Sequence, residues 1–274
     1  MNKNTTDMTA ASYFHDLVIG FYEDEGLVAE IGRTLGFDVE QDVFMAAAFF
    51  YPSEKVVCQE DRELLFDAAA KTAMLSERNR NMDSPQIMTC DKGVCVMLVA
   101  ESKAAMQEVL KKVRETVPAQ IQALGLDEHV RVGIGTMESG IRGIENTFRN
   151  ASEAVRAGEI FKKDRVLLEY MGMEIYSSIN QMVISYGSRL TRTVWSSLSD
   201  REKKVLSAYY KCKEESSRTA GQLGMTKQQV EESLRQVQRD TGLDVRDTED
   251  NFKLHFIVIA RKILEHDERM RRGR

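Results

Sequence analysis

The sequence contains no apolar run that could cross a lipid bilayer, and it contains few cysteines. A membrane-spanning helix needs about 18 or more consecutive apolar residues, and no segment of the 274 residues provides them. Residues 1–9 lack a basic segment followed by an apolar one, so they do not resemble a secretory signal. The four cysteines are scattered, which fits reduced thiols better than a disulfide framework. We therefore expect a cytoplasmic protein without membrane contact.

The sequence also has no strong excess of charge of one sign. Its net charge is −5, with 30% charged and 42% hydrophobic residues, which is typical of a globular protein. Residues 1–199 carry 21 Lys and Arg against 29 Asp and Glu, whereas residues 200–274 carry 17 against 14. An acidic body with a mildly basic C-terminal segment is compatible with nucleic-acid binding through that segment. A surplus of this size is also common on solvated helices.

The first 171 residues alternate between helical and strand patterns. We expect strands at residues 43–51, 86–90, 94–99, 130–135 and 165–169. We expect helices within residues 8–35 and at 61–78, 103–124 and 141–157. Asp91-Lys92-Gly93 marks a tight hairpin between the second and third strands. This order predicts an α+β fold, ferredoxin-like, with an antiparallel-rich sheet of about five strands and helices mainly on one face.

From residue 173 onward the pattern predicts only helices. Their expected spans are 173–197, 200–213, 217–223, 227–240 and 248–270. Thr226 and Gln229 have the spacing of a capping box, which places the start of the fourth of these helices. Gly224 permits a sharp turn before it, and the small Ala220 allows close helix packing. This is the order of parts in a helix-turn-helix, whose second helix enters the DNA major groove N-terminus first.

The helix-turn-helix interpretation assigns a role to each exposed polar residue. Lys227, Gln228 and Gln229 would face base edges, and Ser217, Arg218 and Arg235 would reach phosphates. The complete predicted set of DNA-contacting residues is Ser217, Arg218, Thr226, Lys227, Gln228, Gln229, Ser233 and Arg235. A helical hairpin that binds nothing shows a similar pattern. Glu231 and Glu232 favour that alternative, because carboxylates near phosphates are unfavourable unless they face cytosine or point away.

The same stretch resembles the C-terminal helix-turn-helix of the CdaR/PucR family, the sugar-diacid and purine-catabolism regulators. The family's Ser/Thr-x-Thr-Ala-x-x-Leu run stands here at residues 217–223. Its Thr-Gly-Leu-Asp ending stands at residues 241–244 and is followed by Arg246 and Asp250. Between them the family usually has Tyr-Arg where this chain has Glu232 and Ser233.

Upstream, residues 130–170 resemble the last third of the degenerate GGDEF-like domain of the same family. The resemblance rests on Gly133-Ile134-Gly135, on the Asn-Ala-Ser-Glu-Ala-Val run at 150–155, and on Leu168-Glu169-Tyr170. Over residues 12–265 it implies N-terminal helices at 1–37, a GGDEF-like domain at 38–171, a linker helix at 172–198 and a helix-turn-helix domain at 199–274. It also implies a homodimer or higher homo-oligomer on double-stranded DNA, with a small-molecule or protein effector and no cofactor.

A GGDEF-like fold raises the alternative of a nucleotide cyclase. Such an enzyme needs carboxylates at the end of its first strand and in its hairpin, because two divalent cations must hold the triphosphate. Here the first strand ends Phe49-Phe50-Tyr51-Pro52, and the hairpin reads Asp91-Lys92-Gly93. We therefore expect no catalytic residues and no metal site. The remaining alternative is a helix-turn-helix that has lost DNA binding and serves as a protein-interaction module.

Overall fold

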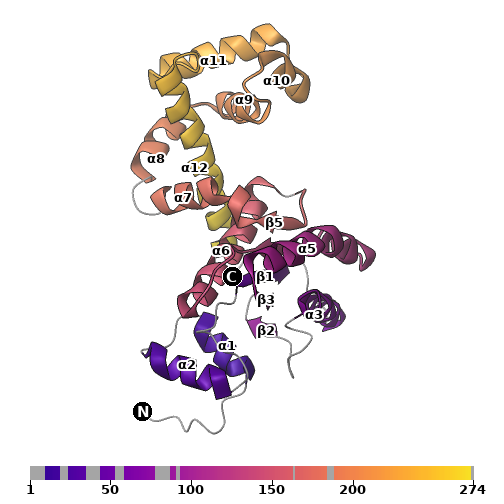
Figure 1. Ribbon diagram of the computed structural model, residues 1–274. Helices are drawn as coiled ribbons and strands as arrows, with labels where there is room; N and C mark the ends of the chain where they lie inside the picture. Colours follow the sequence, from indigo (N-terminus) through magenta and orange to yellow (C-terminus); the bar gives the residue numbers. More distant parts are fainter. Residues whose placement is uncertain are drawn as a thin grey trace. The chain divides into compact units, whose positions relative to one another are not determined.

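The protein divides into two compact units, residues 1–177 and 178–274 (Figure 1). The computed structural model describes residues 10–18, 24–34, 44–52, 59–77, 87–90, 93–162, 164–183 and 188–272. None of the helices within these ranges is both long and apolar enough to cross a membrane.

The first unit is built on a five-stranded sheet. Its strands are β1 (Phe44–Pro52), β2 (Ile87–Cys90), β3 (Gly93–Ala100), β4 (Val130–Ile134) and β5 (Leu167–Glu169). They lie in the order β2-β3-β1-β4-β5. β3 and β4 flank β1 antiparallel, β2 pairs antiparallel with β3, and only β5 joins in parallel, beside β4. The predicted α+β fold with an antiparallel-rich sheet is confirmed.

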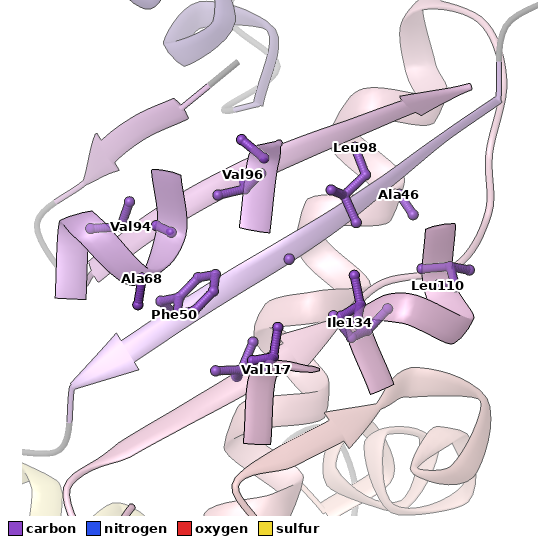
Figure 2. Packing of buried hydrophobic residues seen from close by; sticks show 14 of the residues in the cluster. Ala46, Phe50, Ala68, Val94, Val96, Leu98, Leu110, Val117 and Ile134 are labelled. Atoms are coloured by element: carbon purple, nitrogen blue, oxygen red, sulfur yellow. The ribbon is translucent and has the colours of Figure 1, made fainter. Parts of the chain in front are cut away.

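Helices cover both faces of this sheet. They are α1 (Ala10–Val18), α2 (Glu25–Thr34), α3 (Gln59–Ala73), α5 (Lys103–Ala123) and α6 (Ile141–Phe161). On one face Ala46 and Phe50 of β1 pack with Ala68 of α3 and Val117 of α5 (Figure 2). On the other face Met45, Ala47 and Phe49 pack with buried residues of α1, α2 and α6.

The expectation that helices lie mainly on one face is therefore wrong. The cause is visible in β1, whose residues 45–50 are all apolar and all buried. Successive side chains of a strand point to opposite faces, so a wholly apolar strand requires cover on both of them.

Helix α6 approaches the sheet unusually closely, at the glycines around the end of β4. A Cβ atom at Gly135 would overlap the carbonyl oxygen of Thr147. Thr147 itself is buried, and its hydroxyl accepts a hydrogen bond from the Ala47 amide (2.9 Å) and donates one to the Thr136 carbonyl (2.6 Å). These bonds fix α6 against β1 and against the loop that follows β4.

The described part of the second unit is helical. Its helices are α8 (Ser188–Ser197), α9 (Asp200–Lys211), α10 (Ser216–Leu223), α11 (Lys227–Thr241) and α12 (Thr248–Arg272), and α7 (Glu174–Met182) spans the division between the units. Leu206, Val230, Val237 and Leu254 are among the buried residues that hold α9, α11 and α12 together. The single linker helix expected at 172–198 corresponds to α7 and α8, with residues 184–187 outside the described residues.

Candidate nucleic-acid interface

Helices α10 and α11 are joined by a tight turn at Gly224. Gly224 has φ +63°, in the left-handed region that residues with a Cβ rarely adopt. Its amide and that of Met225 both donate to the Ala220 carbonyl, which ends α10. Thr219 and Ala220 are buried, so the two helices pack through small side chains. Both features follow the sequence prediction.

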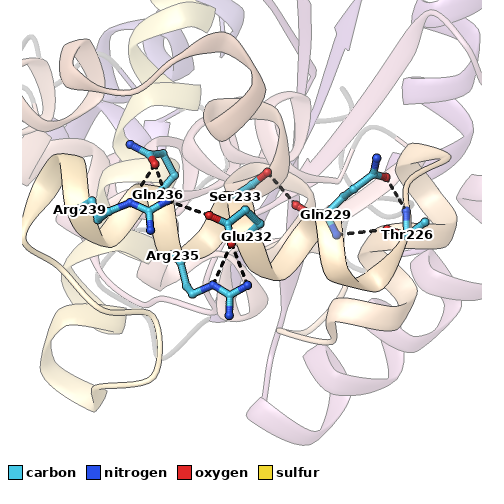
Figure 3. Close-up of polar contacts among 7 residues, drawn as sticks. All are labelled: Thr226, Gln229, Glu232, Ser233, Arg235, Gln236 and Arg239. Atoms are coloured by element: carbon cyan, nitrogen blue, oxygen red, sulfur yellow. Dashed lines mark hydrogen bonds and ion pairs between the residues drawn. The ribbon is translucent and has the colours of Figure 1, made fainter.

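The start of α11 is fixed by a capping box. The Thr226 hydroxyl accepts a hydrogen bond from the Gln229 amide (3.2 Å), and the Gln229 side-chain oxygen accepts one from the Thr226 amide (2.9 Å) (Figure 3). The predicted cap is therefore confirmed. The cap uses polar groups of Thr226 and Gln229, both of which are predicted to contact DNA. Lys227 and Gln228 are the exposed residues of this first turn that take no part in the cap.

Ser233 lies on the buried side of α11, which corrects the sequence prediction. Its side chain is only 5% exposed, and its hydroxyl donates to the Gln229 carbonyl (2.9 Å) (Figure 3). The sequence contained the signal, because Val230, Ser233, Leu234 and Val237 follow the i, i+3, i+4, i+7 spacing of one helical face. We therefore do not include Ser233 in the candidate interface.

Glu232 is held between two arginines of its own helix. One of its carboxylate oxygens accepts a hydrogen bond from Arg235 and the other from Arg239, each at 2.8 Å (Figure 3). The hydrogen bonds from Arg239 and then Arg235 lower the pKa of the Glu232 carboxyl group. Two cations and one anion leave this patch net positive, so Glu232 does not present an uncompensated negative charge. The sequence prediction missed Arg239.

The other predicted cations also have acidic partners nearby. Arg218 pairs with Glu215 at 2.8 Å, and Lys227 lies 3.7 Å from Glu231. All of these side chains are at least a third exposed. An exposed ion pair contributes only about 0–1 kcal/mol. A phosphate group can therefore replace the carboxylate at small cost, and the pairs do not prevent DNA contact.

The exposed side of α11 borders an open hollow. Arg201, from the first turn of α9, lines this hollow together with Gln228, Glu232 and Arg235. Ser217, in the first turn of α10, is exposed. The structure thus brings the start of α9 to the surface that also carries Gln228 and Arg235. Arg201 was not predicted from the sequence, because its position depends on how α9 packs.

A nucleotide cyclase would carry its metal-binding carboxylates at the end of β1 and in the hairpin between β2 and β3, and the structure describes only the first of these two positions. β1 ends without a carboxylate, at Tyr51 and Pro52, and the hairpin residues Asp91 and Lys92 lie outside the described residues. Within the ranges that are described, no three His, Cys, Asp or Glu side chains are grouped so that they could hold a metal ion.

One comparison with known protein families matches part of the first unit. A family model described as a GGDEF-like domain matches residues 20–157, which include β1 to β4 and most of α6. The search of curated proteins found no match. Among solved structures, the regulator of polyketide synthase expression from Bifidobacterium adolescentis is 18% identical, with a TM-score of 0.41. The similarity covers 92% of this chain and 97% of that one.

Proposed function

The chain belongs to the GGDEF-like domain family, and we propose that it is a transcriptional regulator that binds double-stranded DNA. In this proposal α10 and α11 form a helix-turn-helix, and α11 is the reading helix. The GGDEF-like domain acts as a regulatory domain without catalysis. The finer assignment to CdaR/PucR-type regulators rests on the motif residues at 217–223 and 241–244.

The observation that carries the proposal is the exposed and capped first turn of α11. A reading helix enters the major groove with its N-terminal residues leading. In α11 these are Lys227 and Gln228, both exposed, and the Thr226–Gln229 cap fixes the helix start beside them. A glutamine amide can form two hydrogen bonds with adenine, whereas a lysine can donate to guanine. The exposed side chains therefore suit direct contact with base edges.

Regulation would act through a dimer. Two copies would read two half-sites about one helical turn, or a multiple of it, apart. A ligand or protein on the GGDEF-like domain would change the spacing of the two reading heads through residues 172–198, by favouring one of two pre-existing arrangements. DNA affinity measured with and without candidate effectors tests this step. Unchanged affinity with every effector would count against it.

Selection of DNA from a randomised pool tests the reading role of α11. Wild type and Gln228→Ala would each be used to enrich duplexes, with Gln181→Ala as the control because Gln181 is an exposed glutamine on α7. A bidentate base contact discriminates by about 1–3 kcal/mol. Gln228→Ala is therefore expected to lose preference at one base position, while the control keeps the full motif. Identical motifs from wild type and Gln228→Ala, or no enrichment by wild type, would contradict the proposal.

A second candidate function is a protein-interaction module. It is favoured by Glu231 and Glu232 on the exposed side of α11 and by the acidic partners of Lys227 and Arg218. Salt dependence separates the two functions. Binding to several DNA phosphates weakens steeply as salt rises, because counterions are released on binding, whereas a packed protein interface need not show this.

A further inference from the structure

A second pocket of the C-terminal unit lies between the start of α10 and one side of α11. It has a volume of about 140 Å³. α9 contributes Tyr209, α10 contributes Ser216, α11 contributes Glu231 and Arg235, and the turn after α11 contributes Asp244 and Arg246. Only Arg235 among them is also predicted from the sequence to contact DNA.

Tyr209 is the most informative residue of this pocket. Its side chain is only 9% exposed, yet its hydroxyl has no hydrogen-bond partner among the described residues. The neighbouring Tyr210 differs, because its hydroxyl donates to the Asn251 carbonyl (3.1 Å) and side-chain oxygen (2.8 Å). Tyr209 lines the pocket, and a tyrosine hydroxyl can donate one hydrogen bond. The Tyr209 hydroxyl is therefore available to an acceptor that enters the pocket.

The start of α10 provides further donors at the same pocket. Ser216 is the first residue of α10, and the amides of a helix's first turn have no partner within the helix. The preceding residue, Glu215, makes no capping hydrogen bond with its side chain, which pairs with Arg218 instead. Amides without a partner in the helix and the helix dipole together favour an anion at such a position.

Arg246 adds a positive charge. It is exposed, and its guanidinium group has no carboxylate partner in the described part of the chain. Arg246 and Tyr209 line the same pocket. Burial and Glu214 raise the pKa of Tyr209, whereas the charge of Arg246 lowers it. Arg246 thus differs from Arg218, Lys227 and Arg235, each of which already has an acidic partner.

Two carboxylates also line the pocket, and both have partners. Asp244 accepts hydrogen bonds from the Arg246 amide (2.9 Å) and from the Gln238 side chain (3.1 Å). Glu231 lies 3.7 Å from Lys227. The groups without partners are therefore donors: the Tyr209 hydroxyl, the first amides of α10 and the Arg246 guanidinium.

We propose that this pocket binds one phosphate group of the DNA backbone, beside the groove that α11 enters. The Tyr209 hydroxyl and the α10 amides donate to its oxygens, and Arg246 neutralises its charge. The inference rests on the proposed function and adds the residues that hold the backbone. Because the contact is to phosphate, it is independent of DNA sequence.

The test uses the full chain and a fluorescent duplex of random sequence, titrated at several salt concentrations. Arg246→Gln is expected to weaken binding and to reduce the slope of log affinity against log salt by about 1. Tyr209→Phe removes a single hydroxyl without changing the charge, so we expect about 10-fold weaker binding with an unchanged slope. Lys204→Gln is the matched control, because Lys204 is an exposed cation of α9 that does not line the pocket.

Each outcome separates this inference from the proposed function. If wild type has no affinity for DNA, both fail. If wild type binds and both pocket variants bind equally well, the pocket inference alone fails. An equal loss of slope in Lys204→Gln would also overturn it, because general electrostatics would then explain the effect. A titration with inorganic phosphate completes the test, since tight phosphate binding that Tyr209→Phe abolishes would assign the pocket to a free anion.

Discussion

Glu232 is the shared acidic partner of two cations of α11, Arg235 and Arg239. It binds Arg235 and Arg239 with separate carboxylate oxygens, and all three side chains are about half exposed. While these pairs persist, DNA must compete with a carboxylate that is already in place. Glu232 is therefore expected to weaken DNA binding by occupying two arginines, rather than by repelling phosphates directly.

Substitution of Glu232 by glutamine tests this competition. Glu232→Gln removes the negative charge and releases Arg235 and Arg239, so we expect tighter DNA binding. The slope of log affinity against log salt should steepen by about 1–2, because roughly one counterion is released for each new phosphate contact. Fluorescence anisotropy at several salt concentrations measures both quantities. Glu249→Gln, which removes the carboxylate paired with Lys253 on α12, is the matched control, and equal effects of the two substitutions would contradict the account.

Substitution of Ser233, in contrast, is expected to have little effect on DNA binding. Its hydroxyl is buried and bonded to the carbonyl of its own helix, and alanine has a higher helix propensity than serine. Ser233→Ala should leave DNA affinity within about twofold and change the free energy of unfolding by less than about 1 kcal/mol. Anisotropy and urea denaturation check the two values. A large loss of affinity without a loss of stability would restore Ser233 to the interface.

At the scale of elements, the sequence predicted those structural features that depend only on residues close together along the chain. The capping box at Thr226 and the turn at Gly224 were predictable because both are local. The predicted end of α11 differs from the observed one by a single residue. The sequence did not predict that helices cover both faces of the sheet, that Arg201 lies beside α11, or that Tyr209 lines a pocket. Each of these features depends on how separate elements pack. The burial of Ser233 could have been predicted, because its spacing from Val230 and Val237 places all three residues on one face of α11.

The contact between β4 and α6 predicts a strong effect of one added methyl group. Gly135→Ala would place a Cβ against the Thr147 backbone, and overpacking of this kind costs about 1–3 kcal/mol. Gly221→Ala is the matched control, because nothing lies within 4 Å of the added Cβ and Gly221 is inside α10. The control should stabilise its unit by up to about 1 kcal/mol. Urea denaturation measures both, and equal stability of Gly135→Ala and wild type would refute the close packing.

His255 on α12 makes the second unit sensitive to acid. Its ring stacks on Tyr210 with centroids 4.3 Å apart, and burial lowers its pKa, with Glu214 opposing and Lys262 adding to the effect. Because the pKa of His255 is lower in the folded state than in the unfolded chain, folding favours the neutral form of its ring. Its contribution to stability is therefore complete above the unfolded pKa of about 6.5 and decreases as the pH falls below that value.

Thermal unfolding between pH 7.5 and 5.5, roughly one unit on either side of the unfolded histidine pKa, tests this prediction. Wild type should lose stability over this interval, and His255→Gln should lose less, because the substituted side chain cannot take up a proton. His15→Gln is the control, since His15 is exposed and lies in the first unit. If wild type and His255→Gln show the same dependence on pH, the stacked ring does not influence stability.

At the scale of the whole molecule, a GGDEF-like domain is followed in the chain by a helical unit that we propose binds DNA. The family match covers residues 20–157, and the proposed reading helix lies outside that range. DNA binding by the second unit is therefore the central claim, on which the roles of the dimer and of an effector both depend.

The most direct test is a fluorescence-anisotropy titration of the purified chain on pooled upstream DNA fragments, at low and moderate salt. Lys227→Glu and Lys253→Glu would be compared, because each lysine has an acidic partner four residues away on its own helix. We expect micromolar or tighter binding that weakens with salt, is lost in Lys227→Glu and persists in Lys253→Glu. A folded, dimeric protein that binds no DNA at either salt concentration would contradict the account and favour the protein-interaction module.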